Sequence, residues 1–216
     1  MGRRRKLHAK HFRRPVNKAA AATVAQPPSR RHAPTQRIDT SSWYRIENNA
    51  SAGTTAIYIY DEIGMWGVNA SDFMLALREV GAGRTELHLN SPGGDVFDGI
   101  AIYNCLRAHA AVVDVVVDSL AASAASVIAQ AGDTVTMMPG SQMMIHEASG
   151  LCMGNSEDMA EMAKMLDQQS DNIAGIYATA AGGDRTEWRA RMKAETWYMA
   201  EEAVAVGLAD RVDTGE

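Results

Sequence analysis

The sequence predicts an α/β domain built on a largely parallel sheet. Short runs of alternating or β-branched residues recur along the chain, and segments with helical apolar spacing separate them. Strands that alternate with helices in this way are typical of parallel sheets with right-handed crossovers. The chain has 216 residues, of which 46% are hydrophobic, enough for one domain with a sizeable core.

The first part of the domain predicts two successive strand-helix-strand units. Ser71 can cap the first helix, and Gly81 and Gly83 end it before the next strand. The loop SPGGD then leads into a second helix. The expected elements are a strand at 54–60, a helix at 71–80, a strand at 86–90, a helix at 99–109 and a strand at 112–117.

The second part of the domain predicts a long helix whose apolar face is rich in methionine. Thioethers fill irregular apolar contacts, so this face indicates core or a subunit interface rather than a cofactor site. In a monomer, part of an apolar face of that length would stay exposed to solvent. The expected elements are a helix-like stretch at 120–131, strands at 134–138 and 142–145, the long helix capped by Asn155 or Ser156, and a last helix at 200–206.

Residues 1–42 predict a basic arm or removable pro-segment that does not fold by itself, ahead of a domain at 43–216. Residues 1–38 hold 11 of the 21 Lys and Arg residues and no acid, which leaves a net charge of about −16 on the rest. Such an arm is a solvated tail or contacts an acidic partner or nucleic acid. No apolar run is long enough for a membrane span, and Cys105 and Cys152 match no metal-ligand spacing, which points to a reducing compartment.

Ser123 is the first candidate for chemistry. It lies where an apolar strand runs into a stretch of small, helix-forming residues, DSLAASAAS. A helix start offers the positive end of the helix dipole, and the amide of Ala124 would lack a helical partner and could donate to an oxyanion. Ser126, one turn later, is a rival nucleophile. Small residues serve tight helix packing equally well, so this run alone does not indicate catalysis.

Two further segments add a base and a loop. His146 ends a short apolar strand, MMIH, and can point from the sheet edge toward Ser123, which makes it the best general-base candidate among six histidines. In NSPGGDV the adjacent glycines let the backbone approach a ligand closely, but the segment lacks the pattern of a nucleotide-binding loop.

Taken together, SPGG, the AAS run, the MIH strand end and the segment AETWYMAEEAVAVGLAD resemble the ClpP-like serine peptidases over residues 54–212. The resemblance implies a crotonase-like α/β fold with a spiral of strands, in which the long helix forms a handle. It also implies assembly into rings around an internal chamber and peptide substrates. No metal or organic cofactor is expected.

The resemblance carries five residues over to this sequence. Ser123 matches the nucleophile, His146 the base, and Glu195 the acid that would orient the imidazole, while the amides of Gly94 and Ala124 match the oxyanion donors. The Clp proteolytic subunits have aspartate at the position of Glu195, so this sequence departs from the family there. The lower-ranked acid is the residue after the histidine, Glu147, which would project away from it on a continuing strand.

Within that family, SLAASAASVIAQAGD and the C-terminal segment are similar to phage-encoded head maturation (prohead) peptidases. Such an enzyme would cut scaffold and capsid proteins in the host cytoplasm or in an assembling prohead, and the arm could attach to acidic scaffold. The alternatives are a housekeeping ATP-dependent Clp proteolytic subunit, a catalytically silent shell or scaffold protein, and a crotonase-type acyl-CoA enzyme. A Ser-Lys peptidase is disfavoured, because neither Lys164 nor Lys193 occupies an evident base position.

Overall fold

An eight-stranded sheet forms the centre of the computed structural model, which describes residues 44–49, 54–81 and 83–215. The strands are β1 (Tyr44–Asn49), β2 (Thr54–Ile59), β3 (Arg84–Ser91), β4 (Val112–Ala122), β5 (Thr134–Met137), β6 (Gln142–Ile145), β7 (Thr196–Met199) and β8 (Arg211–Val212). Their order is β1-β2-β3-β4-β5-β8, and β6 pairs with the end of β4 and with β7. All pairs are parallel except β1–β2 and β6–β7. The predicted α/β class with a largely parallel sheet is confirmed.

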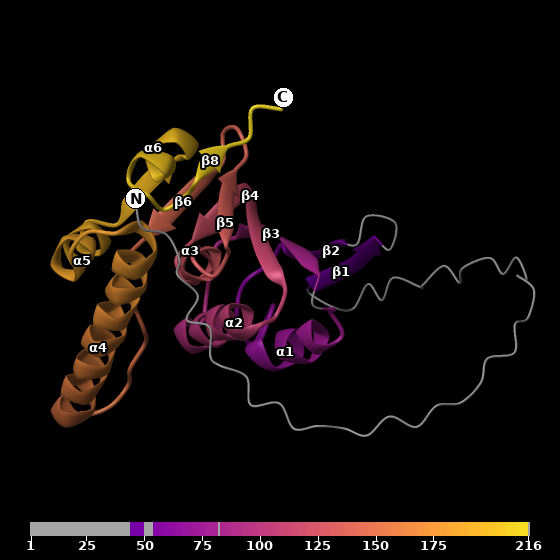
Figure 1. Cartoon of the computed structure of the whole chain (residues 1–216). Helices are drawn as coiled ribbons and strands as arrows, with labels where there is room; N and C mark the ends of the chain where they lie inside the picture. The colour runs from indigo at the N-terminus through magenta and orange to yellow at the C-terminus, as the bar shows by residue number, and fades with distance from the viewer. Residues whose placement is uncertain (1–43, 50–53, 82, 216) are drawn as a thin grey trace, which may run out of the picture. The chain divides into compact units, whose positions relative to one another are not determined.

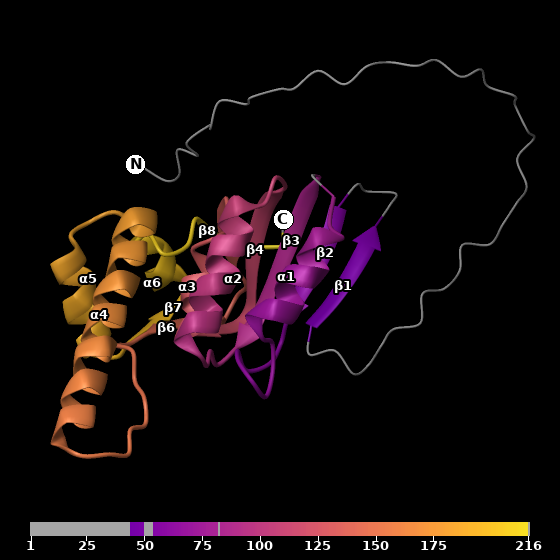
Figure 2. The same ribbon diagram turned by 90° about the horizontal axis from the view of Figure 1, so that it is seen from below.

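Helices pack mainly on one face of this sheet. Figures 1 and 2 show α1, α2 and α3 side by side on that face, whereas α4 and α5 lie together beyond β6 and β7. The helices are α1 (Ala70–Arg78), α2 (Val96–Ala108), α3 (Ala124–Ala129), α4 (Ser156–Ala181), α5 (Arg185–Lys193) and α6 (Ala200–Ala205). Within the described ranges, no helix is both long enough and apolar enough to cross a membrane.

The core lies between the sheet and these helices. Side chains alternate along β3, so Leu87 and Leu89 are fully buried while His88 between them faces the other side and is half-buried. Val115 of β4 and Ile128 of α3 complete the same apolar layer. Each such aliphatic side chain stabilises the fold by about 1.5–3 kcal/mol when fully buried. This layer gives the loops at the sheet edge a rigid base.

The long helix α4 begins and packs as its sequence predicts. Asn155 caps it, and Asp158 closes a reciprocal capping box with the Asn155 amide. Ile173 and Tyr177 are buried, whereas Met159 near the start is 43% exposed. The C-terminal half of α4 therefore packs into the core, and the N-terminal half extends beyond it.

Several predicted boundaries were wrong. The stretch predicted as helix from residue 120 begins as strand, because β4 continues to Ala122 by pairing with β6. Helix α2 begins at Val96 rather than 99, since the Asp95 side chain caps it, and α1 is capped by Asn69 rather than Ser71. Strands β1, β7 and β8 and helix α5 were not predicted. The predicted arm at 1–42 lies outside the described residues.

Candidate active site

Ser123 occupies a sharp turn between β4 and α3. Its backbone has φ 53° and ψ −123°, a region that L-residues other than glycine rarely adopt. A residue held in this conformation destabilises the fold by on the order of 1–3 kcal/mol. Such residues cluster at functional sites. The turn directs Ser123 into a cavity at the edge of the sheet.

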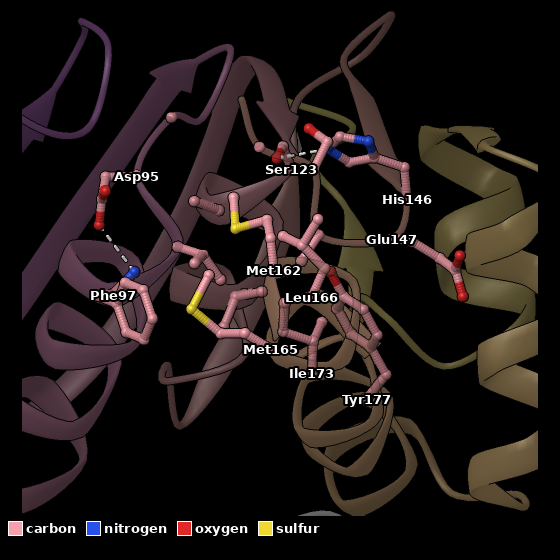
Figure 3. Close-up of a pocket in the computed structure, with 17 residues that line it drawn as sticks. Asp95, Phe97, Ser123, His146, Glu147, Met162, Met165, Leu166, Ile173 and Tyr177 are labelled. Carbon is pink, nitrogen blue, oxygen red and sulfur yellow. Dashed lines mark hydrogen bonds between the residues drawn. The ribbon is translucent and has the colours of Figure 1, made fainter. Parts of the chain in front are cut away.

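His146 faces Ser123 across this turn. Its Nε2 lies 2.7 Å from the Ser123 Oγ (Figure 3). The contact follows from strand pairing: Ala122 is opposite Met144 in the parallel β4–β6 ladder, and the Ser123 amide donates to the Met144 carbonyl over 2.9 Å. Both strands therefore end side by side, and the next residues bring a hydroxyl and an imidazole together.

The SPGG loop packs directly against the same turn. The Ile63 amide donates to the Gly93 carbonyl over 2.8 Å, and the Asp95 amide donates to the Ile63 carbonyl over 2.7 Å. A Cβ on Gly93 would lie 2.7 Å from the Ser123 Cβ, so only glycine allows this approach. The loop thereby brings Gly94 next to the turn.

Gly94 and Ala124 both line the cavity together with Ser123 and His146. Among the described residues, neither amide donates a hydrogen bond to the protein. Two unpaired N–H groups beside a serine hydroxyl are what an oxyanion needs. The structure therefore brings four of the five predicted site residues together.

The cavity has a volume of about 220 Å³ and an apolar wall. Most of this wall comes from α4, with further residues from α2 and α3. Figure 3 shows the α4 side chains gathered below Ser123. The larger apolar lining residues include Phe97, Val127, Met162, Met165, Leu166, Ile173 and Tyr177. The wall suits an apolar side chain of a bound ligand.

Glu195, the predicted acid, is not in hydrogen-bond contact with His146 in the described part of the chain. It is exposed, and its backbone has φ 47°, which makes it the second non-glycine residue with positive φ among those described. In the antiparallel β6–β7 ladder the last pair is Ile145 opposite Thr196, and His146 and Glu195 are the next residues beyond that pair. The two residues therefore adjoin the end of the same ladder, although no side-chain bond joins them among the described residues.

Glu147 is turned away from the serine. Its carboxylate accepts from Arg189 Nε at 2.5 Å, and Arg189 also reaches Asp167 of α4 at 2.6 Å (Figure 3 shows Glu147). Burial opposes the charge of Arg189, but the hydrogen bonds to Asp167 and Glu147 outweigh it and raise the pKa of the guanidinium. Glu147 therefore anchors α5 and α4 to the strand end that carries His146.

Ser126, the rival nucleophile, is fully buried. Its hydroxyl donates to the Ser123 carbonyl over 2.6 Å and contacts the Tyr177 hydroxyl at 2.7 Å. No local pattern in the sequence indicates these roles of Arg189 and Tyr177, since each side chain bridges residues 22 to 51 positions apart. Among the described residues, no group of three His, Cys, Asp or Glu side chains could hold a metal ion.

Comparison with known proteins agrees with this geometry. The family model described as Clp protease matches residues 48–216. The chain is 33% identical over 129 residues to the ATP-dependent Clp protease proteolytic subunit of Deinococcus radiodurans, covering 59% of this chain and 63% of that protein. Proteins of the same name from Leuconostoc citreum and Pleurastrum terricola are each 32% identical, covering 59% and 58% of this chain and 66% and 65% of their own lengths. The chain thus spans just under two thirds of each of these curated relatives.

The close approach of the SPGG loop to the serine turn predicts different costs for two glycine substitutions. Gly93→Ala and Gly140→Ala impose similar strain, because both glycines have positive φ, at 91° and 79°. Only Gly93→Ala also clashes, since a Cβ on Gly140 meets nothing within 4 Å. We expect the free energy of unfolding, measured in urea, to fall about 1–3 kcal/mol further for Gly93→Ala. Equal losses would show that the loop does not pack on the turn.

Proposed function

Because the chain belongs to the Clp protease family, we propose that it is a serine endopeptidase with Ser123 as nucleophile and His146 as general base. The observation that carries this proposal is the distance of 2.7 Å between Ser123 Oγ and His146 Nε2. A base within hydrogen-bond reach of a hydroxyl can remove its proton as the oxygen attacks a carbonyl.

The proposed reaction has two halves. His146 Nε2 takes the Ser123 proton while Oγ bonds to the carbonyl carbon of the substrate, and the amides of Gly94 and Ala124 stabilise the negative oxygen. The imidazolium then gives its proton to the leaving amine, which departs and leaves an acyl-enzyme. Water, deprotonated by His146, attacks the ester and releases the second peptide with Ser123 restored.

Glu195 is the proposed orienting acid. The pairing of Thr196 with Ile145, the residues next to Glu195 and His146, supports this role, and the charge of Glu195 would stabilise the imidazolium that forms during the reaction. The positive φ at Glu195 ends helix α5, because Glu195 follows the C-cap residue Ala194 and its amide donates to the Met192 carbonyl over 3.0 Å. Glu147 is the weaker candidate, since Arg189 already binds its carboxylate.

The substrates we propose are proteins or peptides with an apolar side chain at the cleaved bond. Methionine and leucine side chains of α4 form the wall beside Ser123. Burying an apolar substrate side chain against them would favour binding by about 25 cal/mol for each Å² of apolar surface removed from water. An acidic side chain would be desolvated there close to Asp95 and Glu147, two carboxylates that also line the cavity.

Self-assembly into rings is part of the proposal. Leu151 and Met153, in the segment after His146, are 93% and 91% exposed, and Met159 at the start of α4 is 43% exposed. Adjacent exposed apolar side chains of this kind favour an interface, and contact between copies would cover them.

Two biological roles use this same chemistry. The names of the relatives support a housekeeping proteolytic subunit that works with an ATP-dependent partner. The head maturation role, with scaffold and capsid substrates, is supported only by the sequence resemblance. A neighbouring unfoldase gene would indicate the first role, and neighbouring portal and capsid genes the second.

Labelling with a fluorophosphonate tests the nucleophile. We expect the parent chain to be labelled at Ser123, and Ser123→Ala and His146→Ala to fall to background, because the hydroxyl or its base is gone. Ser119→Ala, an exposed serine of β4, is the matched control and should label as the parent does. Label retained in Ser123→Ala, on Ser126 for example, would contradict the assignment. A catalytically silent shell protein would give no label in any variant.

Peptide hydrolysis by acid variants tests Glu195. We expect Glu195→Ala to lower kcat/KM on the order of 10⁴-fold if this residue acts as the third member of a triad, and Glu195→Asp to restore most of the rate. Glu147→Ala should instead lower the urea midpoint, because Arg189 loses one of its carboxylates, with a smaller effect on rate. Parent-like hydrolysis by Glu195→Ala would exclude it as the orienting acid.

A further inference from the structure

The strained backbone of Ser123 is held by contacts on its carbonyl oxygen. The amides of Ser126 and Val127 approach this oxygen at 3.0 and 3.4 Å, as at any helix start. The Ser126 hydroxyl adds a shorter bond, at 2.6 Å. The shortest contact on the carbonyl therefore depends on the side chain at position 126.

A second hydroxyl supports the first. Tyr177 Oη lies 2.7 Å from Ser126 Oγ, and both side chains are almost completely buried. A serine hydroxyl has one proton, and Ser126 gives it to the Ser123 carbonyl, so the phenol of Tyr177 must be the donor to Ser126. The result is a directed chain of hydrogen bonds from Tyr177 through Ser126 to the backbone of Ser123, in which each bond polarises the next.

The phenol at the head of this chain keeps its proton. Burial raises the pKa of Tyr177 well above its ordinary value, and the hydrogen bond with Ser126 offsets only part of that effect. Tyr177 is therefore a donor over the whole pH range in which a histidine can act as base.

The orientation of the Ser123 carbonyl decides where the Ala124 amide points. The C=O of Ser123 and the N–H of Ala124 belong to one planar peptide unit, so fixing one end fixes the other. Ala124 is one of the two proposed oxyanion donors and lines the cavity. A rotation of this unit would turn its N–H away from the reacting oxygen.

Tyr177 also joins the serine turn to the helix that forms the cavity wall. It lies on α4, one turn after Ile173, which lines the cavity, and its ring packs on Trp188 of α5 with centroids 5.8 Å apart. The far end of the hydrogen-bond chain is thus held by two packed helices.

We propose that Ser126 and Tyr177 are positioning residues for the reaction: they orient the peptide unit between Ser123 and Ala124, and so align the nucleophile and one oxyanion donor. This inference rests on the proposed function, since only a reacting Ser123 gives the alignment a consequence. A purely structural pair of buried hydroxyls would affect stability alone.

The test compares Tyr177→Phe and Ser126→Ala with two matched controls. Tyr198→Phe and Ser141→Ala remove the same groups, and both of these hydroxyls are buried without a hydrogen-bond partner in the described part of the chain. The measurements are the second-order rate of fluorophosphonate labelling, kcat and KM for a fluorogenic peptide, and the urea midpoint. We expect labelling and kcat to fall about tenfold or more in Tyr177→Phe and Ser126→Ala at nearly unchanged KM, with both controls within about twofold of the parent.

The double variant adds a further criterion. The two hydroxyls act in series, so the double variant carrying Ser126→Ala and Tyr177→Phe should be labelled about as slowly as Ser126→Ala alone. Independent effects would instead multiply the two decreases in rate. If Ser126→Ala does not fold, Tyr177→Phe decides alone, since it keeps the ring and removes one oxygen atom.

The outcomes separate this inference from the proposed function. A parent chain that is not labelled at Ser123 overturns the proposed function, and the positioning role with it. A parent chain that is labelled, with Tyr177→Phe reacting as fast as Tyr198→Phe, overturns the positioning role alone. The positioning role is also overturned if Tyr177→Phe lowers the urea midpoint but keeps the labelling rate of the parent chain.

Discussion

The parallel pairing of β6 with the end of β4 is the constraint on which the site depends. Only three residue pairs form this ladder, ending with Ala122 opposite Met144, yet they set the position of everything that follows. Side chains alternate along a strand, so a slip of one residue would turn His146 to the other face. The ladder leaves no such freedom, because Met143 and Ile145 must be buried. Burial of two apolar side chains thus determines which way the imidazole points.

The remaining parts of the site are fixed by groups that approach the serine turn from outside the sheet. Gly93 packs against it from the β3 loop, and the Ser126 hydroxyl supports it from within α3. Arg189 acts indirectly, because it binds Glu147, the residue after His146, and Asp167 of α4. Its side chain is only 14% exposed. Removing either carboxylate would leave a largely buried charge with fewer partners, which is costly. The strained turn and its base are therefore held from several directions.

Local signals in the sequence predicted the sheet class and made Ser123 and His146 candidates, and the family resemblance joined them as a pair. Contacts between distant segments explain what these signals missed. The AAS run and the MIH strand end could be found because each is a short segment at an element boundary. The extension of β4 to Ala122 could not be found in this way, because residues 120–122 have helix-forming side chains and become strand only by pairing with β6. Tyr177 falls on the apolar face of α4, and nothing in the spacing of a helix indicates that its hydroxyl contacts Ser126. Glu195 came from a family resemblance, and its nearness to His146 depends on the pairing of β7 with β6, a contact between segments about 50 residues apart that no local pattern shows.

Helix α4 contributes both to the cavity wall and to the hydrogen bonds behind Ser123. Met162, Met165 and Leu166 line the cavity, and Tyr177, eleven residues after Leu166, also lines it and contacts the Ser126 hydroxyl that binds the Ser123 carbonyl. A helix is stiff over this distance, because each turn is bonded to the next. A change in how α4 packs would therefore alter the wall that receives the substrate and the orientation of the Ser123 carbonyl at the same time. In the proposed reaction, substrate binding and the reactivity of Ser123 would therefore be coupled through α4, and the buried hydroxyls of Ser126 and Tyr177 would be the contact that couples them.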